Sequence, residues 1–190
     1  MNSFYNEEEL QHIGFKKIGK DIKISRKASI YNPEKMEIGN NVRIDDFCIL
    51  SGKIKIGSHI HIAAYCGLWG SEGIYIDDFC NLSSRISIYT YSDDYSGLTL
   101  TNPCIPDKYK KLDKGEIHIN RHVIIGTFSV ILPGVGIGEG VAVGAMSLVK
   151  NNLKSWRIYA GIPAKELKKR KKDVLKLEGE FLKEYQQVHR

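Results

Sequence analysis

The sequence predicts an all-β fold, a parallel β-helix of about six coils, and two observations predict it. Aliphatic residues return every six positions through most of the chain. Small or branched residues stand four positions after many of them, with glycine, asparagine or aspartate in between. A helix would rotate these aliphatic rungs around its axis, and a flat strand would not need turn residues at fixed intervals. A strand–turn unit of six residues satisfies both requirements, with the rungs pointing inward.

Eighteen rungs group into six coils of three units each. The coils begin at Ile18, Ile38, Ile56, Ile76, Ile119 and Ile137. All three departures from the period fall between the third rung of one coil and the first rung of the next, so they share one corner. The longest departure, residues 89–118, is expected to leave the prism as a loop. Six coils at a sheet spacing of about 4.8 Å would make a prism roughly 29 Å tall.

Helical caps are expected at both ends, because an open end of a solenoid would expose its core. Residues 1–17 contain an Asn-x-x-Glu capping pattern and form the N-terminal cap. The β-helix covers residues 18–153. Residues 154–190 hold a C-terminal motif and a helix that begins after Pro163.

Composition and charge limit the possible function classes. The chain has 190 residues, 42% of them hydrophobic, and a net charge of +6, which indicates one soluble globular domain. No apolar run approaches the ~18 residues of a membrane span and the start lacks a signal peptide, so we expect a cytoplasmic protein. The basic segment 165–172 suits a polyphosphate, but no nucleic-acid reading module accompanies it. Cys48 and Cys66 are expected to pack inward as free thiols.

Two blocks of the sequence carry a family resemblance. The stretches "VIIGTFSVILPGVGIGEGVAVGAMSLV" and "YAGIPAKELKKR" resemble the hexapeptide-repeat acyltransferases, which are related to galactoside and maltose acetyltransferases. The resemblance covers about residues 18–170. It implies a left-handed coil, a homotrimer with active sites at subunit interfaces, and acetyl-coenzyme A as co-substrate without a metal.

A narrower likeness concerns the loop. The stretch "YTYSDDYSGLTLTNPCIPDKY", followed by "HINRHVIIG", looks like acetyltransferases of bacterial surface-polysaccharide clusters. With the opening "NSFYNEEELQHIGFKKIG", it is similar to those that N-acetylate a nucleotide-linked 4-amino-4,6-dideoxyglucose for O-antigen or capsule. This likeness implies a nucleotide-sugar substrate whose amine attacks the thioester directly.

The family resemblance also implies where the coenzyme lies, in a groove beside the last coils. In relatives that read "IGS" the third residue contacts the pantetheine arm, and Thr127 stands there after Gly126. The alanine of the family's "GAxS" motif is matched by Ala145. A long, thin donor needs such small residues, because they let backbone amides approach its amide links.

Three lysines are implied in coenzyme binding. The family's "TK" pair reads Lys150 and Asn151 here, so a cation replaces a hydroxyl group. Lys165 and Lys168 stand where two basic side chains of the family reach the nucleotide phosphates. Clustered cations are the groups that phosphates prefer.

The catalytic histidine of the galactoside-type relatives is missing. It follows "YTAT" in those proteins, whereas this chain reads "YTYS" followed by Asp93 and Asp94. The enzyme must bind the amine acceptor, take its proton and stabilise the oxyanion that forms on the thioester carbonyl. These tasks do not demand an imidazole base. We expect the two aspartates to hold or deprotonate the amine, and backbone N–H groups at corners such as Gly126 to stabilise the oxyanion.

Three alternatives stay open at this point. An O-acetyltransferase of a saccharide hydroxyl would need a stronger base, and His118, which closes the loop, is the candidate. A β-helix zinc carbonic anhydrase would use His118 and His122 with a third histidine. A non-catalytic assembly module would use the prism alone. The loop and the donor motif favour N-acetyl transfer.

Overall fold

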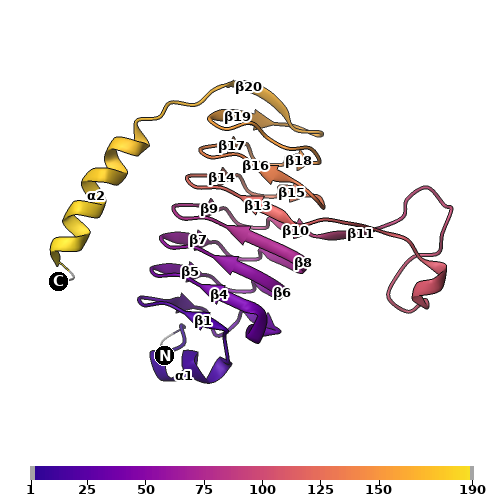
Figure 1. Cartoon of the computed structure of the whole chain (residues 1–190), viewed down its shortest axis with the longest axis horizontal. Helices are drawn as coiled ribbons and strands as arrows, with labels where there is room; N and C mark the ends of the chain where they lie inside the picture. The colour runs from indigo at the N-terminus through magenta and orange to yellow at the C-terminus, as the bar shows by residue number, and fades with distance from the viewer. Residues whose placement is uncertain (1–2, 189–190) are drawn as a thin grey trace.

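The chain folds into a left-handed parallel β-helix with three strand ladders around one core (Figure 1). The computed structural model describes residues 3–188, so residues 1–2 and 189–190 of the predicted caps lie outside it. Neighbouring coils pair in parallel with rung opposite rung, for example Ile24 with Ile44. The predicted fold class is confirmed.

The three ladders are the faces of the prism, numbered in chain order. Face 1 contains β1 (Lys17–Ile18), β4 (Met36–Ile38), β13 (Ile117–Ile119), β16 (Gly136–Ile137) and the second halves of β6 (Ile49–Ile56) and β8 (Gly67–Ile76). Face 2 contains β2 (Lys23–Ile24), β5 (Val42–Ile44), β7 (Ile60–Ile62), β9 (Asn81–Leu82), β14 (Ile124–Ile125), β17 (Ala142–Val143) and β19 (Arg157–Ala160). Face 3 contains β3 (Ser29–Tyr31), the first halves of β6 and β8, β10 (Ser87–Tyr89), β15 (Val130–Ile131) and β18 (Leu148–Val149). Corners 1–2, 2–3 and 3–1 are named for the faces they join.

The predicted rungs form the core. All of them are buried except Ile18 and Ile30 in the first coil, which are partly exposed. Cys48 and Cys66 are buried free thiols, as predicted, and the thiol of Cys66 donates to the carbonyl of Ser83 at 3.1 Å. The core is a continuous stack in which each coil covers the one before it.

Two corners carry columns of residues in the left-handed backbone conformation. At corner 1–2 they are Asp21, Asn41, His59, Phe79, His122, Gly140 and Trp156, and at corner 2–3 they are Phe47, Tyr65, Arg85, Phe128 and Met146. Bulky residues are uncommon in this conformation. Here the N–H of such a residue donates to the coil below, for example Phe128 N to Ser84 O at 3.2 Å. Successive coils therefore present their corner side chains in register.

The ends of the prism differ from the prediction at one point. The N-terminal cap is the expected helix, α1 (Glu7–Ile13), with a reciprocal capping box between Asn6 and Glu9. The predicted helix after Pro163 is wrong in its first part, because β20 (Lys165–Lys169) is a strand antiparallel to β19. Gly161, at a φ of 104°, turns the chain back, and the free edge of β19 supplies backbone partners.

The C-terminal segments complete the architecture. Leu153 and β19 add a partial seventh turn above the six predicted coils. Helix α2 (Val174–Val188) then descends beside corner 1–2 (Figure 1). No helix within residues 3–188 has the length and apolarity needed to cross a membrane.

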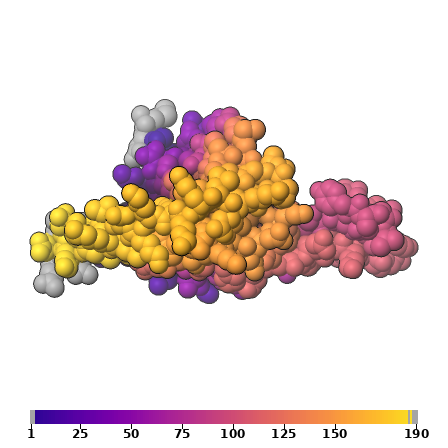
Figure 2. Space-filling view, turned by 90° about the horizontal axis from the view of Figure 1, so that it is seen from above, coloured from indigo at the N-terminus to yellow at the C-terminus, as the bar shows by residue number. Residues whose placement is uncertain are grey.

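The long loop leaves the prism at corner 3–1, as the shared position of the departures predicts. Its base is the antiparallel pair β11 (Tyr91–Asp93) and β12 (Leu112–Lys114), and its outer part holds the 3₁₀ turn η2 (Asp107–Tyr109). Another 3₁₀ turn, η1 (Pro33–Lys35), occupies the same corner lower in the prism. The loop projects away from the prism on the side opposite α2, in two perpendicular views (Figures 1 and 2).

Candidate active site

The candidate donor-binding residues meet at corner 2–3. Gly126 and Thr127 follow β14, and Ala145 follows β17 in the next coil. A Cβ atom on Gly126 would lie 2.4 Å from the Ala145 nitrogen, which is closer than side chains approach backbone. Glycine is therefore required here by the spacing of the two coils.

The backbone N–H groups of this corner are not equivalent. The Gly126 N–H donates to Val143 O at 2.8 Å, so the expectation that it stabilises an oxyanion is wrong. The N–H groups of Thr127 and Ala145 have no acceptor among residues 3–188. Because a side chain at position 126 would cover the Ala145 nitrogen, Gly126 keeps that donor open.

Two hydroxyl groups lie at the same corner. The Thr127 hydroxyl donates to Ser84 O at 2.6 Å, so its free lone pairs can accept from an amide N–H. Ser84 holds the equivalent corner position one coil below, and its hydroxyl makes no hydrogen bond in the part of the chain that the structure describes. Sequence reasoning missed Ser84, although its spacing from the rung Leu82 equals that of Thr127 from Ile125.

The predicted phosphate-binding lysines are spread over the top of the prism. Lys165 lies opposite Ala160 in the hairpin of β19 and β20, at corner 2–3.

 A Cβ atom on Gly144 would lie 2.9 Å from the Cβ of Ala160. The hairpin of β19 and β20 therefore packs directly on the coil that contains Ala145. Lys168 lies opposite Ile158, further along face 2. Lys150 follows β18 and lies at corner 3–1, so the width of face 3 separates it from the other two.

The loop aspartates have different surroundings. The Asp94 carboxylate accepts hydrogen bonds from the Ser96 N–H at 2.8 Å and from the N–H and hydroxyl of Thr99, both at 3.1 Å. These donors, those of Ser96 first, lower the pKa of Asp94 from its usual 3.8 to about 2. Asp93 accepts a weaker bond, from the Asn102 N–H at 3.3 Å. Asp94 is thus a preorganised anion.

A cavity of about 410 Å³ lies between the base of the loop and face 3. Asp93 is the carboxylate in its lining, and Trp69 and Tyr89 form its wall, with their rings parallel and 4.6 Å apart. Tyr91 and Tyr95 of the loop complete this wall. Aromatic surface with one charged group is a common lining for a small organic ligand.

The two halves of the candidate site lie on different edges of one chain. The loop leaves at corner 3–1, whereas Thr127 and Ala145 lie at corner 2–3. Strands β15 and β18 of face 3 separate the two corners in these coils. One chain alone therefore does not bring Asp94 to the donor corner.

Comparison with known proteins gives this site its chemical class. No protein-family model matches the chain. The chain is 44% identical over 182 residues to the dTDP-4-amino-4,6-dideoxy-D-glucose acyltransferase of Escherichia coli, an alignment that covers 94% of this chain and 95% of that protein. The chain belongs to this family of N-acyltransferases.

Solved structures agree with this assignment. AntD, an N-acyltransferase from Bacillus cereus solved with dTDP and 3-hydroxybutyryl-CoA, is 57% identical, with a TM-score of 0.96 over 98% of this chain and 100% of AntD. An AntD variant solved with dTDP-4-amino-4,6-dideoxyglucose and coenzyme A matches with a TM-score of 0.95. The predicted resemblance and the acyltransferase class are confirmed. They replace the alternative predictions of a carbonic anhydrase and of a non-catalytic assembly module.

His118 lies apart from the loop aspartates in this N-acyltransferase. Its ring stacks on Tyr75 on face 1, with centroids 4.7 Å apart, and its Nε2 lies 3.4 Å from a Glu116 carboxylate oxygen. The cavity that contains Asp93 does not include His118. Within one chain the structure therefore does not pair the histidine with the carboxylates.

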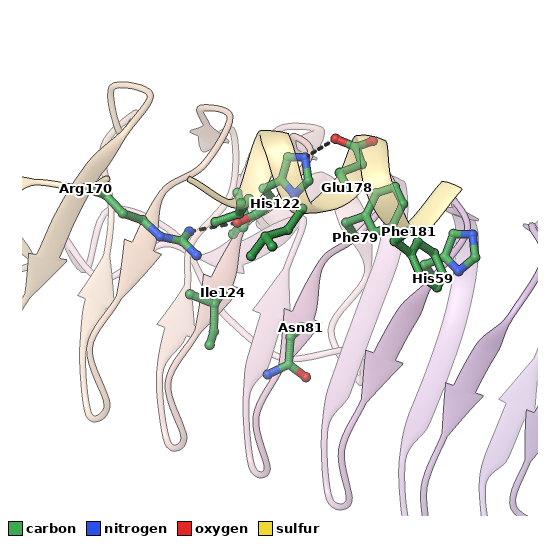
Figure 3. Close-up of a pocket in the computed structure, with 11 residues that line it drawn as sticks. His59, Phe79, Asn81, His122, Ile124, Arg170, Glu178 and Phe181 are labelled. Carbon is green, nitrogen blue, oxygen red and sulfur yellow. Dashed lines mark hydrogen bonds and ion pairs between the residues drawn. The ribbon is translucent and has the colours of Figure 1, made fainter. Parts of the chain in front are cut away.

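Another cavity, of about 480 Å³, lies between α2 and corner 1–2 (Figure 3). His59, Phe79 and Phe181 line it with aromatic rings that contact one another. Arg170 donates to the carbonyl of His122 at 2.8 Å and to two further carbonyls of the next coil. These contacts hold the C-terminal segment against the prism, and the cavity contains none of the residues predicted for acetyl transfer.

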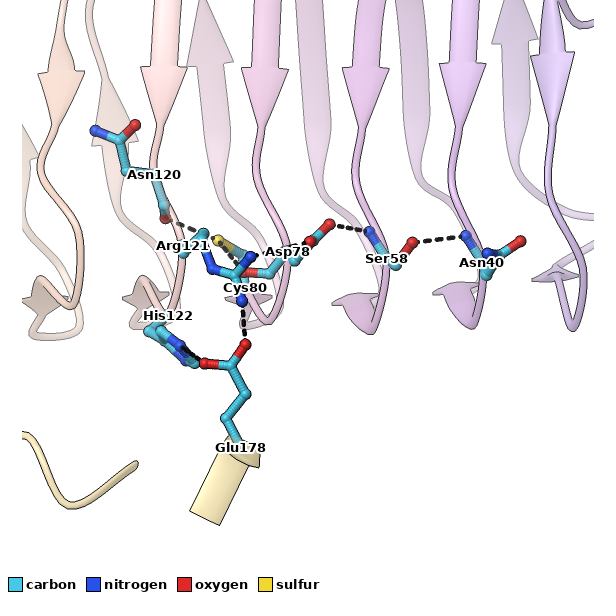
Figure 4. Close-up of polar contacts among 8 residues, drawn as sticks. All are labelled: Asn40, Ser58, Asp78, Cys80, Asn120, Arg121, His122 and Glu178. Carbon is cyan, nitrogen blue, oxygen red and sulfur yellow. Dashed lines mark hydrogen bonds and ion pairs between the residues drawn. The ribbon is translucent and has the colours of Figure 1, made fainter. Parts of the chain in front are cut away.

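An ionic network anchors α2 at the same corner (Figure 4). Glu178 pairs with Arg121 and accepts a hydrogen bond from His122 Nε2 at 2.8 Å. Arg121 also lies 3.4 Å from Asp78. His122 is therefore engaged structurally, and no three His, Cys, Asp or Glu side chains within residues 3–188 gather as a metal site.

Replacing Glu178 by alanine is expected to loosen α2 by about 2 kcal/mol, roughly 30-fold in its opening equilibrium, because Arg121 and His122 lose their shared partner. Hydrogen–deuterium exchange of the α2 amides measures this change. Glu180→Ala is the control, since Glu180 makes only a 3.7 Å contact with Lys176 on the same helix. Equal exchange in both variants would show that the network does not anchor the helix.

Proposed function

We propose that this enzyme transfers an acetyl group from acetyl-coenzyme A to the 4-amino group of dTDP-4-amino-4,6-dideoxyglucose. The observation that carries the proposal is the pair Asp93–Asp94 at the place where hydroxyl-acetylating relatives have a histidine. An ionised carboxylate suits an amine, which carries or develops positive charge, better than it suits a hydroxyl group. The relatives at 44% and 57% identity, one named for this acceptor and the other solved with it, support the same choice.

The donor is proposed to lie along corner 2–3. The free N–H groups of Thr127 and Ala145 are the donors available there for a thioester or pantetheine carbonyl, and the Thr127 hydroxyl can accept from a pantetheine N–H. Lys165, above them at the same corner, is the cation placed best for the coenzyme phosphates. Lys168 and Lys150 lie further away, so we assign them a weaker, longer-range attraction.

The reaction needs one new bond and one broken bond. The neutral amine attacks the thioester carbonyl, and a C–N bond forms while the carbonyl oxygen takes up negative charge. Corner N–H groups stabilise that oxyanion, and Asp94 stabilises the positive charge that develops on nitrogen. The C–S bond then breaks, and the nitrogen proton passes by way of the carboxylate to the departing thiolate. The products are the amide and free coenzyme A.

The low pKa of Asp94 predicts the form of the pH profile. A carboxyl group with a depressed pKa keeps its charge above its usual range and loses it only as the pH falls through about 2. Across about pH 4 to 9 Asp94 stays ionised, so acid loss of kcat/KM is expected to follow protonation of the acceptor amine. An acid limb that disappears in Asp94→Asn would contradict this expectation.

The assembly is proposed to be a homotrimer in which the loop of one subunit reaches corner 2–3 of its neighbour. The loop projects away from its own prism, and its apolar residues Tyr95 and Leu98 are 93% and 88% exposed in the single chain. Sedimentation equilibrium is expected to give three times the chain mass of 21.5 kDa. A monomer at assay concentration that retains full activity would overturn the shared site.

The experiment that tests the function is thiol release from acetyl-coenzyme A with different acceptors. The amino sugar is expected to give rapid release, whereas galactosides and maltose, which offer only hydroxyl groups, give none. Turnover with the hydroxyl acceptors alone would replace the proposal by saccharide O-acetylation. The setting that fits an amino-sugar nucleotide is cytoplasmic synthesis of O-antigen or capsule precursors.

A further inference from the structure

Arg85 stands out among the arginines of residues 3–188 because its side chain has no polar partner. Arg26, Arg43, Arg121 and Arg157 pair with carboxylates, and Arg170 donates to backbone carbonyls. No carboxylate lies within ion-pair distance of Arg85, and its guanidinium makes no hydrogen bond within the described part of the chain. An exposed guanidinium with all five donors free is available to an anion.

Two aromatic rings hold this guanidinium in place. Its central carbon lies 4.5 Å from the ring centroid of Tyr65 in the coil below and 5.4 Å from that of Phe128 in the coil above. The Arg85 N–H donates to Ala64 O at 3.1 Å, which fixes the backbone in its left-handed conformation. Stacking on both faces leaves the edge of the guanidinium, which carries its N–H groups, free to bind.

The position of Arg85 relates it to the candidate reaction corner. Ser84, its neighbour, accepts the Thr127 hydroxyl, so Arg85 lies one coil below the proposed thioester site. Lys165 lies above that site, on the opposite side. If Lys165 binds the coenzyme phosphates above the reaction corner, an anion bound by Arg85 below that corner belongs to the acceptor.

The column continues downward with aromatic surface. Tyr65 stacks on Phe47 at 5.0 Å, and both rings are about half exposed. Lys27 lies over the Phe47 ring at the lower end but is already paired with Asp46. These stacked rings support the guanidinium from below, and they leave its N–H groups as the free polar groups of the column.

We propose that Arg85 binds the diphosphate of the nucleotide-sugar acceptor. This inference rests on the proposed function and names the acceptor subsite within it. Arg85 is a specificity-determining residue and does not touch the reacting atoms.

The test is calorimetric binding of dTDP, thymidine and coenzyme A, each measured separately on the whole protein. Arg85→Met is expected to weaken dTDP binding about 10- to 100-fold and to leave thymidine and coenzyme A within about twofold. Arg85→Lys keeps the charge without the planar fork, so an intermediate loss is expected. Arg43→Met is the matched control, because Arg43 also lies over a ring, that of Phe4, but is paired with Asp45.

Each other outcome overturns the assignment in a distinct way. Unchanged dTDP affinity in a folded Arg85→Met protein would overturn the subsite alone. A loss for coenzyme A instead of dTDP would assign the guanidinium to the donor phosphates. A change in sedimentation mass would make the column a subunit contact. Failure of the wild-type protein to bind dTDP would overturn the proposed acceptor together with this inference.

Discussion

Asp94→Asn is expected to lower kcat for the amino sugar by about 10²- to 10⁴-fold while the fold stays intact. The substitution removes the negative charge that stabilises the attacking nitrogen and that relays its proton. The amide keeps one oxygen for the turn donors of Ser96 and Thr99, so the loop is expected to keep its conformation. Steady-state thiol release, with circular dichroism to confirm folding, measures the effect.

Two variants show whether this effect is specific. Asp93→Asn is expected to raise the KM for the acceptor more than it lowers kcat, because Asp93 lines the cavity and accepts only one long hydrogen bond. Asp113→Asn is the control for loop charge, since the exposed carboxylate of Asp113 in β12 has no hydrogen bond or ion pair in the described chain. If all three variants lose activity equally, net loop charge rather than Asp94 explains the loss.

Gly126→Ala is expected to destabilise the fold by about 1–3 kcal/mol and to weaken coenzyme A binding at least tenfold. The added Cβ would stand 2.4 Å from the Ala145 nitrogen, so the two coils must separate. The same methyl group covers the free N–H that we assign to the donor. Denaturant unfolding and calorimetry with coenzyme A measure the two effects.

Gly179→Ala is the matched control for this substitution. Gly179 lies within α2, and a Cβ there meets nothing within 4 Å. Alanine in a helix interior is favoured over glycine by roughly 0.5–1 kcal/mol, so this variant is expected to be slightly more stable. Unchanged coenzyme A affinity in Gly126→Ala would show that the donor does not lie at corner 2–3.

The period of six predicts the fold because it reports backbone geometry directly. Each rung must point into one narrow core, so a single inserted residue would turn the next rung outward. The three insertions therefore fall at one corner, where the chain can leave without disturbing the core. The capping box of α1 was predictable for a similar reason, since Asn6 and Glu9 act on each other locally.

The errors in the prediction depend on contacts that spacing does not reveal. The composition of residues 165–169 favours a helix, but the segment pairs with the free edge of β19 and therefore forms a strand. The role expected of the Gly126 N–H fails because the next coil already accepts it at Val143. The sequence did not indicate a role for Arg85, because its guanidinium is available only since no carboxylate lies near it in the folded chain.

Mixing two impaired variants, assayed at a low concentration of acetyl-coenzyme A, tests the central claim, a site shared between the loop of one subunit and corner 2–3 of the next. Asp94→Asn and Gly126→Ala proteins, dissociated and reassembled together, are expected to recover activity, because mixed trimers contain some sites with both intact halves. Each variant reassembled alone is expected to keep its own reduced activity. Exchange of subunits confirmed by mass, without any recovery of thiol release, would contradict the shared site.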